Sequence, residues 1–278
     1  MEIILCVRAK KKPALLFRQL ARFGCIATAL VYAIIGVVAL LSLLRIRHGG
    51  ADEASILRLL EDIPFGKAVI AIIFCGMLAY IIWRIYEAIE DPYAYGRKWK
   101  GLATRIITAF SAVSDALIAW PAIESLIGVS TALKDGDPVA QRQMFSELLE
   151  RPGGVWLVAL IGAITSITAI VQFIYVFKEG YEERIDFKRL PPLTGKLIHI
   201  ASYAGHVARG TILGIMGFFM LKAAFTLNGQ YVVNTDKAFD FIGDEISHVV
   251  FAIIAVGTIC YGLFMMAMGY YYDFRKGK

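Results

Sequence analysis

Cysteine is scarce in this sequence, which has four in 278 residues. Cys25, Cys75 and Cys260 lie inside apolar runs, and Cys6 lies in the basic N-terminal segment, so no pair occupies a predicted extracytoplasmic loop. We therefore expect neither a disulfide framework nor a Cys-rich metal site.

Histidine is equally rare, with four in the chain. A bis-histidine haem needs two imidazoles at matching depth on different helices. His199 and His206 share one segment two helical turns apart, and His48 and His248 show no spacing signature. We expect no haem, no other cofactor and no metal.

The portable catalytic motifs are missing too. The sequence contains no Walker phosphate loop, no Gly-x-Ser-x-Gly elbow, no His-Glu-x-x-His zinc motif and no Rossmann glycine pattern. This argues against the enzyme classes that carry such motifs. An intramembrane enzyme acting on lipid, with Asp115 or Glu87 as acid or base, would escape the search and stays an alternative.

Apolar residues, in contrast, are abundant, at 58% of the chain with a mean hydropathy of +0.63. A soluble domain cannot bury that much apolar surface, so we expect a bilayer as solvent. Stretches of about 20 apolar residues, the length that crosses a bilayer, occur six times. The six predicted spans are 20–44, 67–89, 103–128, 154–177, 198–226 and 248–272.

The basic residues predict an orientation. The N-terminus, residues 84–105, the 178–196 loop and the C-terminal tail hold 19 Lys and Arg, whereas the other three loops hold eight. By the positive-inside rule both termini then face the cytoplasm. Because the basic residues form short clusters between apolar runs, we read them as topology signals and expect no nucleic-acid partner.

The chain also resembles itself. Gly24, Gly36, Gly76, Tyr80 and Ala88 match small or aromatic residues 181 positions later, which are Gly205, Gly217, Gly257, Tyr261 and Gly269. A middle copy is visible where residues 59–66 resemble residues 148–154. We therefore predict an all-α polytopic membrane protein of three tandem helical hairpins, in parallel orientation with pseudo-threefold symmetry. Its parts are a basic cytoplasmic N-terminus (1–18) and repeats at 19–95, 96–185 and 186–274.

Three runs carry a family resemblance: 21–36 (ARFGCIATALVYAIIG), 76–88 (GMLAYIIWRIYEA) and 204–210 (AGHVARG). They resemble the domain of unknown function 1206 family, bacterial membrane proteins made of three two-helix repeats. The resemblance covers residues 17–274. It implies the six-span fold and a bacterial inner membrane, and it implies no reaction. The chain departs from the family pattern at Thr28, where an Arg is usual and where the third copy keeps Arg209.

Ionisable groups inside a membrane are costly and are functional candidates by default. Asp115 lies near the middle of the third predicted span, and Arg209 lies at a similar depth in the fifth, so an ion pair between them is geometrically possible. Polar side chains at spacings of three and four share the faces of these residues. The candidate intramembrane polar site comprises Asp115, Arg209, His206, Ser111, Thr108, Thr168 and Gln172. Such residues can also serve as hydrogen-bond glue between helices.

A second candidate lies at the cytoplasmic interface. Arg84 and Glu87 are three residues apart and can pair, while Trp83 and Trp99 match an aromatic belt. Interface anchoring is the simplest interpretation. Clustered cations near the inner leaflet can also bind lipid phosphate, so Arg22, Arg84, Glu87 and Arg105 form a candidate site for lipid head groups.

Three functions remain after this reading. The first is a non-enzymatic structural, lipid-interacting or partner-binding component of the bacterial inner membrane. The second is a small channel or carrier with a polar site around Asp115 and Arg209, and the third is the lipid enzyme above. The expected partners are membrane lipids and either a protein partner or a second copy of the chain.

Overall fold

The computed structural model describes residues 15–44, 66–91, 139–185 and 190–271, with residue 187 and isolated residues between 96 and 112. These parts of the chain are helical and contain no strand. Five helices are long: α1 (Leu15–Leu43), α3 (Gly66–Glu90), α6 (Gly154–Phe177), α7 (Pro192–Thr226) and α9 (His248–Tyr271). The shorter elements are α5 (Val139–Glu150), η1 (Gly180–Glu183), η3 (Gly229–Tyr231), α8 (Thr235–Phe241) and η4 (Ile242–Ile246).

The five long helices are long and apolar enough to cross a membrane. They coincide with five of the six predicted spans, and α6 has the predicted bounds, while α7 begins six residues earlier than predicted. The third predicted span, 103–128, falls mostly outside the described residues, so six spans stay a prediction. The helix α5 precedes α6 in the chain.

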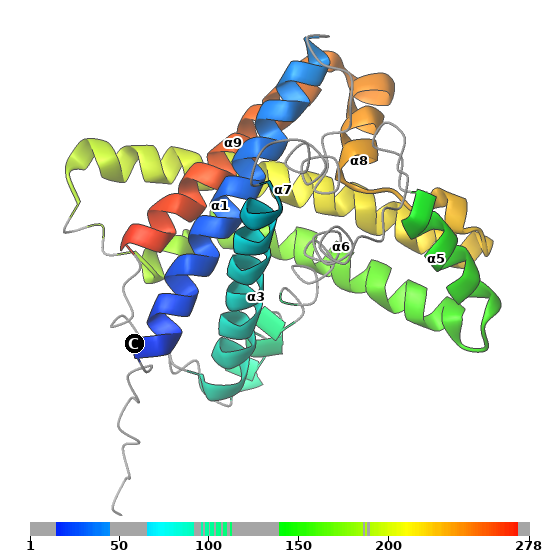
Figure 1. Ribbon diagram of the computed structural model, residues 1–278, viewed down its shortest axis with the longest axis horizontal. Helices are drawn as coiled ribbons and strands as arrows, with labels where there is room; N and C mark the ends of the chain where they lie inside the picture. The colour runs from blue at the N-terminus through cyan, green and yellow to red at the C-terminus, as the bar shows by residue number, and fades with distance from the viewer. Residues whose placement is uncertain are drawn as a thin grey trace, which may run out of the picture.

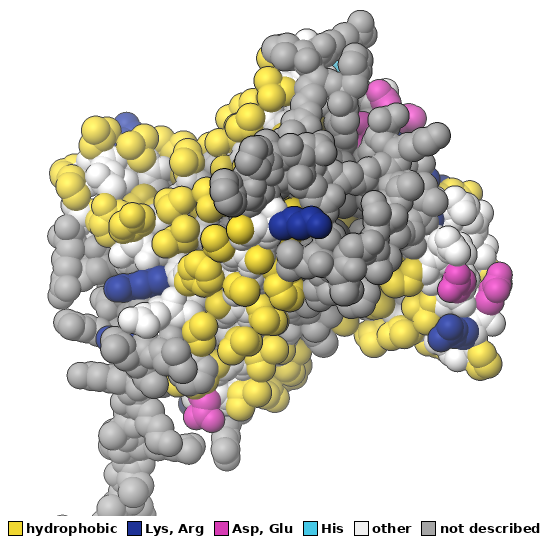
Figure 2. Space-filling model, viewed as in Figure 1, with side chains coloured by type: hydrophobic (Ala, Val, Ile, Leu, Met, Phe, Trp, Pro, Cys, Tyr) yellow, Lys and Arg dark blue, Asp and Glu magenta, His cyan; other side chains and the backbone are white. Residues whose placement is uncertain are grey.

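The surface of the long helices is apolar. Large hydrophobic side chains stay exposed along them, among them Leu30 (44%), Ile72 (58%), Leu160 (54%) and Leu263 (58%). Figure 2 shows hydrophobic side chains covering most of the coloured surface on one face. Exposed apolar side chains in this number are typical of contact with lipid. Trp156 and Phe225, near helix ends, are about four-fifths exposed, as in aromatic belts.

The long helices pack in pairs. In Figure 1, α1 lies against α9 and α3, and α6 lies against α7, which crosses α9. One hydrophobic cluster joins the N-terminal part of α1 with the C-terminal parts of α3 and α9, the end of α6 and the start of α7; it includes Cys25, Trp83, Val176, Ile198 and Phe264. The helix ends that the positive-inside rule assigns to the cytoplasm therefore lie together.

The internal repeat is visible in the packing. A Cβ atom added to Gly24 would lie 2.5 Å from Tyr80 Cβ, and one added to Gly205 would lie 2.5 Å from Tyr261 Cα. Both glycines let the two helices of a hairpin approach at the same place, since each residue lies 181 positions before its counterpart. Gly76 and Gly257 repeat this relation against Ala27 and Ala208. The first and third hairpins thus share one packing register.

One sequence prediction is wrong. Trp83 was assigned to an aromatic belt, but its side chain is only 1% exposed and packs in the hydrophobic cluster that includes Cys25 and Phe264. The sequence alone does not distinguish an aromatic residue near the end of a span that faces lipid from one that faces protein. Trp99, by contrast, is 80% exposed.

Candidate functional site: a cationic cavity between the repeats

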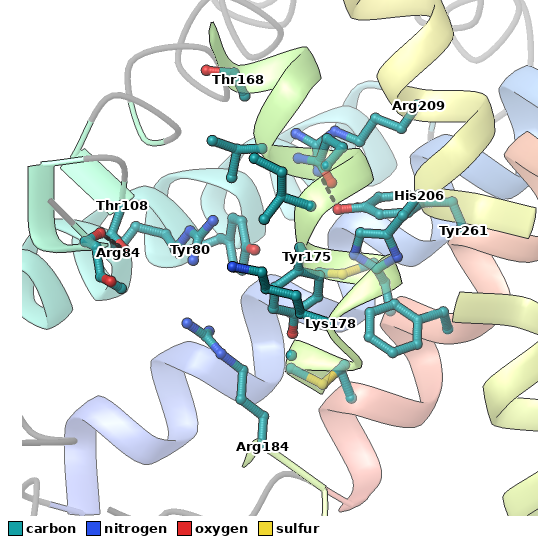
Figure 3. A pocket seen from close by; sticks show the side chains of 18 of the residues that line it. Tyr80, Arg84, Thr108, Thr168, Tyr175, Lys178, Arg184, His206, Arg209 and Tyr261 are labelled. Carbon is teal, nitrogen blue, oxygen red and sulfur yellow. Dashed lines mark hydrogen bonds between the residues drawn. The ribbon is translucent and has the colours of Figure 1, made fainter. Parts of the chain in front are cut away.

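A cavity of about 710 Å³ lies where the C-terminal parts of α3, α6 and α9 approach the middle of α7. Figure 3 shows the side chains that line it. Its cationic wall residues are Arg84, Lys178, Arg184 and Arg209, and no Asp or Glu is among its described lining residues. Tyr80, Tyr175, Tyr261, Thr108, Thr168, Gln172 and His206 add polar atoms to the wall.

Three of the cations form one group. In Figure 3 the charged ends of Arg84, Lys178 and Arg184 point toward the same part of the cavity. Behind them Glu87, with a side chain 1% exposed, pairs with Arg184 at 2.7 Å and with Arg84 at 3.4 Å. A buried carboxylate needs such partners, because an uncompensated buried charge is costly. Glu87 therefore fixes two arginines from distant parts of the chain at the cavity wall.

Arg209 forms a second, deeper cationic position. It is the middle residue of α7 and is only 4% exposed. Its guanidinium donates a hydrogen bond to the Tyr261 hydroxyl, drawn as a dashed line in Figure 3. The guanidinium carbon also lies 4.8 Å from the Tyr261 ring centre and 5.2 Å from that of Tyr32. Cation–π contacts of this kind stabilise a buried cation between aromatic faces.

Three neutral polar side chains of the wall are hydrogen-bonded within their own helices. Thr168 donates to the Ile164 carbonyl at 2.8 Å, and Thr108 donates to the Thr104 carbonyl at 3.0 Å. His206 Nδ1 lies 2.8 Å from the Ser202 carbonyl oxygen, which orients the imidazole along α7. The wall is therefore ordered by its own helices before any ligand arrives.

The segment after α6 positions Lys178 and Arg184. Lys178 ends α6, and Glu179 adopts the left-handed conformation (φ 53°) that turns the chain into η1. Tyr181, buried in η1, makes a 2.8 Å hydrogen bond to His199 Nδ1 and so fastens this turn to α7. Burial, and then the nearby carboxylates of Glu179 and Glu182, raise the pKa of Tyr181 to about 12.

Residues from both candidate sites predicted from the sequence line this cavity. Arg209, His206, Thr108, Thr168 and Gln172 from the intramembrane set line it, as does Arg84 from the interface set, with Glu87 directly behind. Arg22 is exposed on α1, and Arg105 donates to the Ala88 and Ile89 carbonyls at the end of α3, so neither lines the wall. Asp115 and Ser111 lie outside the described residues, and their pairing with Arg209 stays a prediction.

Lys178 and Arg184, which the sequence indicates only as topology signals, are wall residues of the cavity. The aromatic and apolar wall residues Tyr80, Tyr261, Phe264, Met265 and Met268 were not predicted as site residues either. The repeat offset did single out Tyr80 and Tyr261, and this was the one available signal for them. Within the described part of the chain, no group of three or more His, Cys, Asp or Glu is placed to hold a metal ion.

The model of a protein family described as a Domain of Unknown Function (DUF1206) matches the chain three times, over residues 23–91, 108–179 and 204–272. Counted from the last residue of each match, Tyr80, Thr168 and Tyr261 hold the same position, eleven residues before the end. Arg84, Gln172 and Met265 likewise lie seven residues before the end. All six line the cavity, which therefore lies between equivalent faces of α3, α6 and α9.

One protein is similar to this chain over nearly its whole length. A protein of Bacillus subtilis (strain 168), named Uncharacterized protein YxxB, is 28% identical over 271 residues, which cover 95% of this chain and 94% of that protein. No solved structure matches. The three matched segments take up most of the sequence and correspond to its three repeats, so the chain belongs to the DUF1206 family.

Proposed function

We propose that this chain is a multi-pass protein of the bacterial inner membrane, with cytoplasmic termini, that binds an anionic phosphate-type group in the cavity between its repeats. It acts as a lipid-interacting membrane component. The observation that carries the proposal is the charge of the wall: Arg84, Lys178, Arg184 and Arg209 line it, and Glu87 is the one described carboxylate paired with two of them.

The position of the cations supports an anion more than any other ligand. Guanidinium groups match phosphate oxygens with paired hydrogen bonds, and a partly enclosed site strengthens each charge interaction relative to water. Arg84, Lys178 and Arg184 come from the two basic clusters that the positive-inside rule assigns to the cytoplasmic side. Basic pockets between membrane helices on that side typically bind anionic lipid head groups.

Lys178 offers the sharpest test, because it is exposed and lies outside the Glu87 ion pairs. The full chain is purified in detergent, and native mass spectrometry measures binding of dihexanoyl phosphatidic acid and dihexanoyl phosphatidylcholine, which share their chains. We expect the anionic lipid to bind more tightly. In Lys178→Gln its affinity falls about fivefold, the loss of about 1 kcal/mol for one cation near a lipid phosphate.

Lys196→Gln is the matched control, since Lys196 is exposed on the neighbouring helix α7 but does not line the cavity. It should bind as the wild type does. Equal binding of the two lipids, or equal losses in the two variants, would contradict the proposal and leave the cations with a role in topology only.

A carrier of small anions is the second candidate, favoured by the depth of the cavity. Its wall runs from Lys178 at the end of α6 to Arg209 at the middle of α7. If the cavity is part of a transport path, sealed vesicles containing the protein take up phosphate, and Asp115→Asn abolishes uptake while the variant stays folded. Vesicles that take up no more than protein-free controls would exclude this function.

A further inference from the structure

The walls of the cavity differ in chemistry from repeat to repeat. At the position seven residues before the end of each family-model match, α3 presents the Arg84 guanidinium, α6 the Gln172 amide and α9 the Met265 thioether. Equivalent backbone positions thus supply a cation, a neutral hydrogen-bonding group and an apolar surface. A ligand that touches all three must be chemically different at its two ends.

The cavity also has apolar lining residues. Phe264, Met265 and Met268 all come from α9, and all are at most 5% exposed in the described structure. Val171 and Ile174 of α6 are further apolar lining residues. Methionine side chains adapt to irregular apolar ligands, because they are unbranched and polarizable. A free inorganic anion binds through charge and hydrogen bonds, so this apolar wall would not contribute to its affinity.

The cavity also opens onto the surface of the described structure. Ile174 lines it and is nevertheless 46% exposed, and Trp99, another lining residue, is 80% exposed. A ligand held at the cations can therefore continue past Ile174 onto the apolar surface of the long helices. The volume of about 710 Å³ falls in the range of roughly 300–1,000 Å³ that encloses drug-sized organic ligands, and it is far larger than a phosphate ion needs.

From these three observations we infer that the ligand is an anionic amphiphile. Its phosphate-type head lies at Arg84, Lys178 and Arg184, and its hydrocarbon chain lies along Phe264, Met265 and Met268 and leaves the cavity past Ile174. The inference rests on the proposed anion binding and adds the apolar half of the ligand. It distinguishes a lipid from a free phosphate compound as the source of the anionic group.

The test keeps the head group constant and varies the chain. Native mass spectrometry of the full chain measures binding of glycerol 3-phosphate, dihexanoyl phosphatidic acid and dioleoyl phosphatidic acid. Because each methylene that leaves water contributes about fourfold in affinity, we expect at least about a tenfold gain along the series. Met265→Gln, which installs the residue of the second repeat, should remove most of that gain and leave glycerol 3-phosphate binding unchanged.

Met266→Gln is the matched control, since Met266 is the next residue of α9 and does not line the cavity. Met265→Trp keeps the wall apolar but fills the space, so it should also weaken the long-chain lipid if Met265→Gln proves poorly folded. Equal binding of all three compounds, unchanged by either Met265 variant, would overturn the amphiphile and leave anion binding intact. Absence of binding for every anionic compound would overturn both.

Discussion

Replacement of Gly205 by alanine is expected to lower the free energy of unfolding by an amount that the structure allows us to estimate. An added Cβ would lie 2.5 Å from Tyr261 Cα and 2.6 Å from Tyr261 N, which are backbone atoms of α9. A flexible side chain could rotate away, but a helix backbone cannot, so Gly205→Ala forces α7 and α9 apart. The same replacement at Gly214 meets only Ala169 Cβ at 3.8 Å, an ordinary van der Waals distance.

The pair of variants isolates the packing cost. Both replace glycine by alanine in the interior of α7, so both gain the same helix propensity of roughly 0.8–1.0 kcal/mol, and this gain cancels in their difference. Overpacking a well-packed site costs about 1–3 kcal/mol. Because the clash at Gly205 is with backbone, we expect a difference in the free energy of unfolding toward the upper end of that range.

The assay is reversible unfolding of the purified full chain by SDS in mixed micelles, followed by circular dichroism. Gly205→Ala should unfold at a clearly lower SDS fraction than Gly214→Ala, which should match or exceed the wild type. Gly24→Ala, at the equivalent place in the first repeat with Tyr80 Cβ at 2.5 Å, should behave as Gly205→Ala does. Equal stability of the Gly205 and Gly214 variants would refute the close helix approach and with it the shared register of the hairpins.

Three further predictions concern single side chains. Glu87→Gln leaves two arginines without their buried carboxylate, so it should lower the free energy of unfolding by about 3–5 kcal/mol, whereas Glu90→Gln, exposed on the same helix, should change it little by the same unfolding assay. Folding raises the pKa of Tyr181 from 10 to about 12, so the protonated phenol favours the folded state fully below pH 10, and this contribution to stability is lost between pH 10 and 12. Absorbance at 295 nm should show one tyrosine that ionises later than the others, and this late ionisation should be absent in Tyr181→Phe. Asn234 accepts a hydrogen bond from Lys237 N at 3.0 Å at the start of α8, so Asn234→Ala should cost about 1 kcal/mol in thermal unfolding while Asn234→Asp keeps the cap.

Much of the candidate site could be read from periodicity. Residues three and four apart on a helix share a face, so the sequence places Thr168 with Gln172, and His206 with Arg209; in the structure all four line the cavity. The contact between Glu87 and Arg184 could not be read in this way, because the two residues lie in different repeats and neither spacing nor motif links them. Sequence paired Glu87 with its near neighbour Arg84, which in the structure is the longer of its two ion pairs.

The sequence by itself determined five long apolar helices and the repeat register. These follow from the length of the apolar runs and from small or aromatic residues that recur at one offset. Only the tertiary structure decided which helices pack together, that Trp83 is buried, and that cations of two separate basic clusters line one cavity. Pairing between distant helices depends on side-chain contacts across the chain, and a linear pattern of hydrophobicity and charge does not contain them.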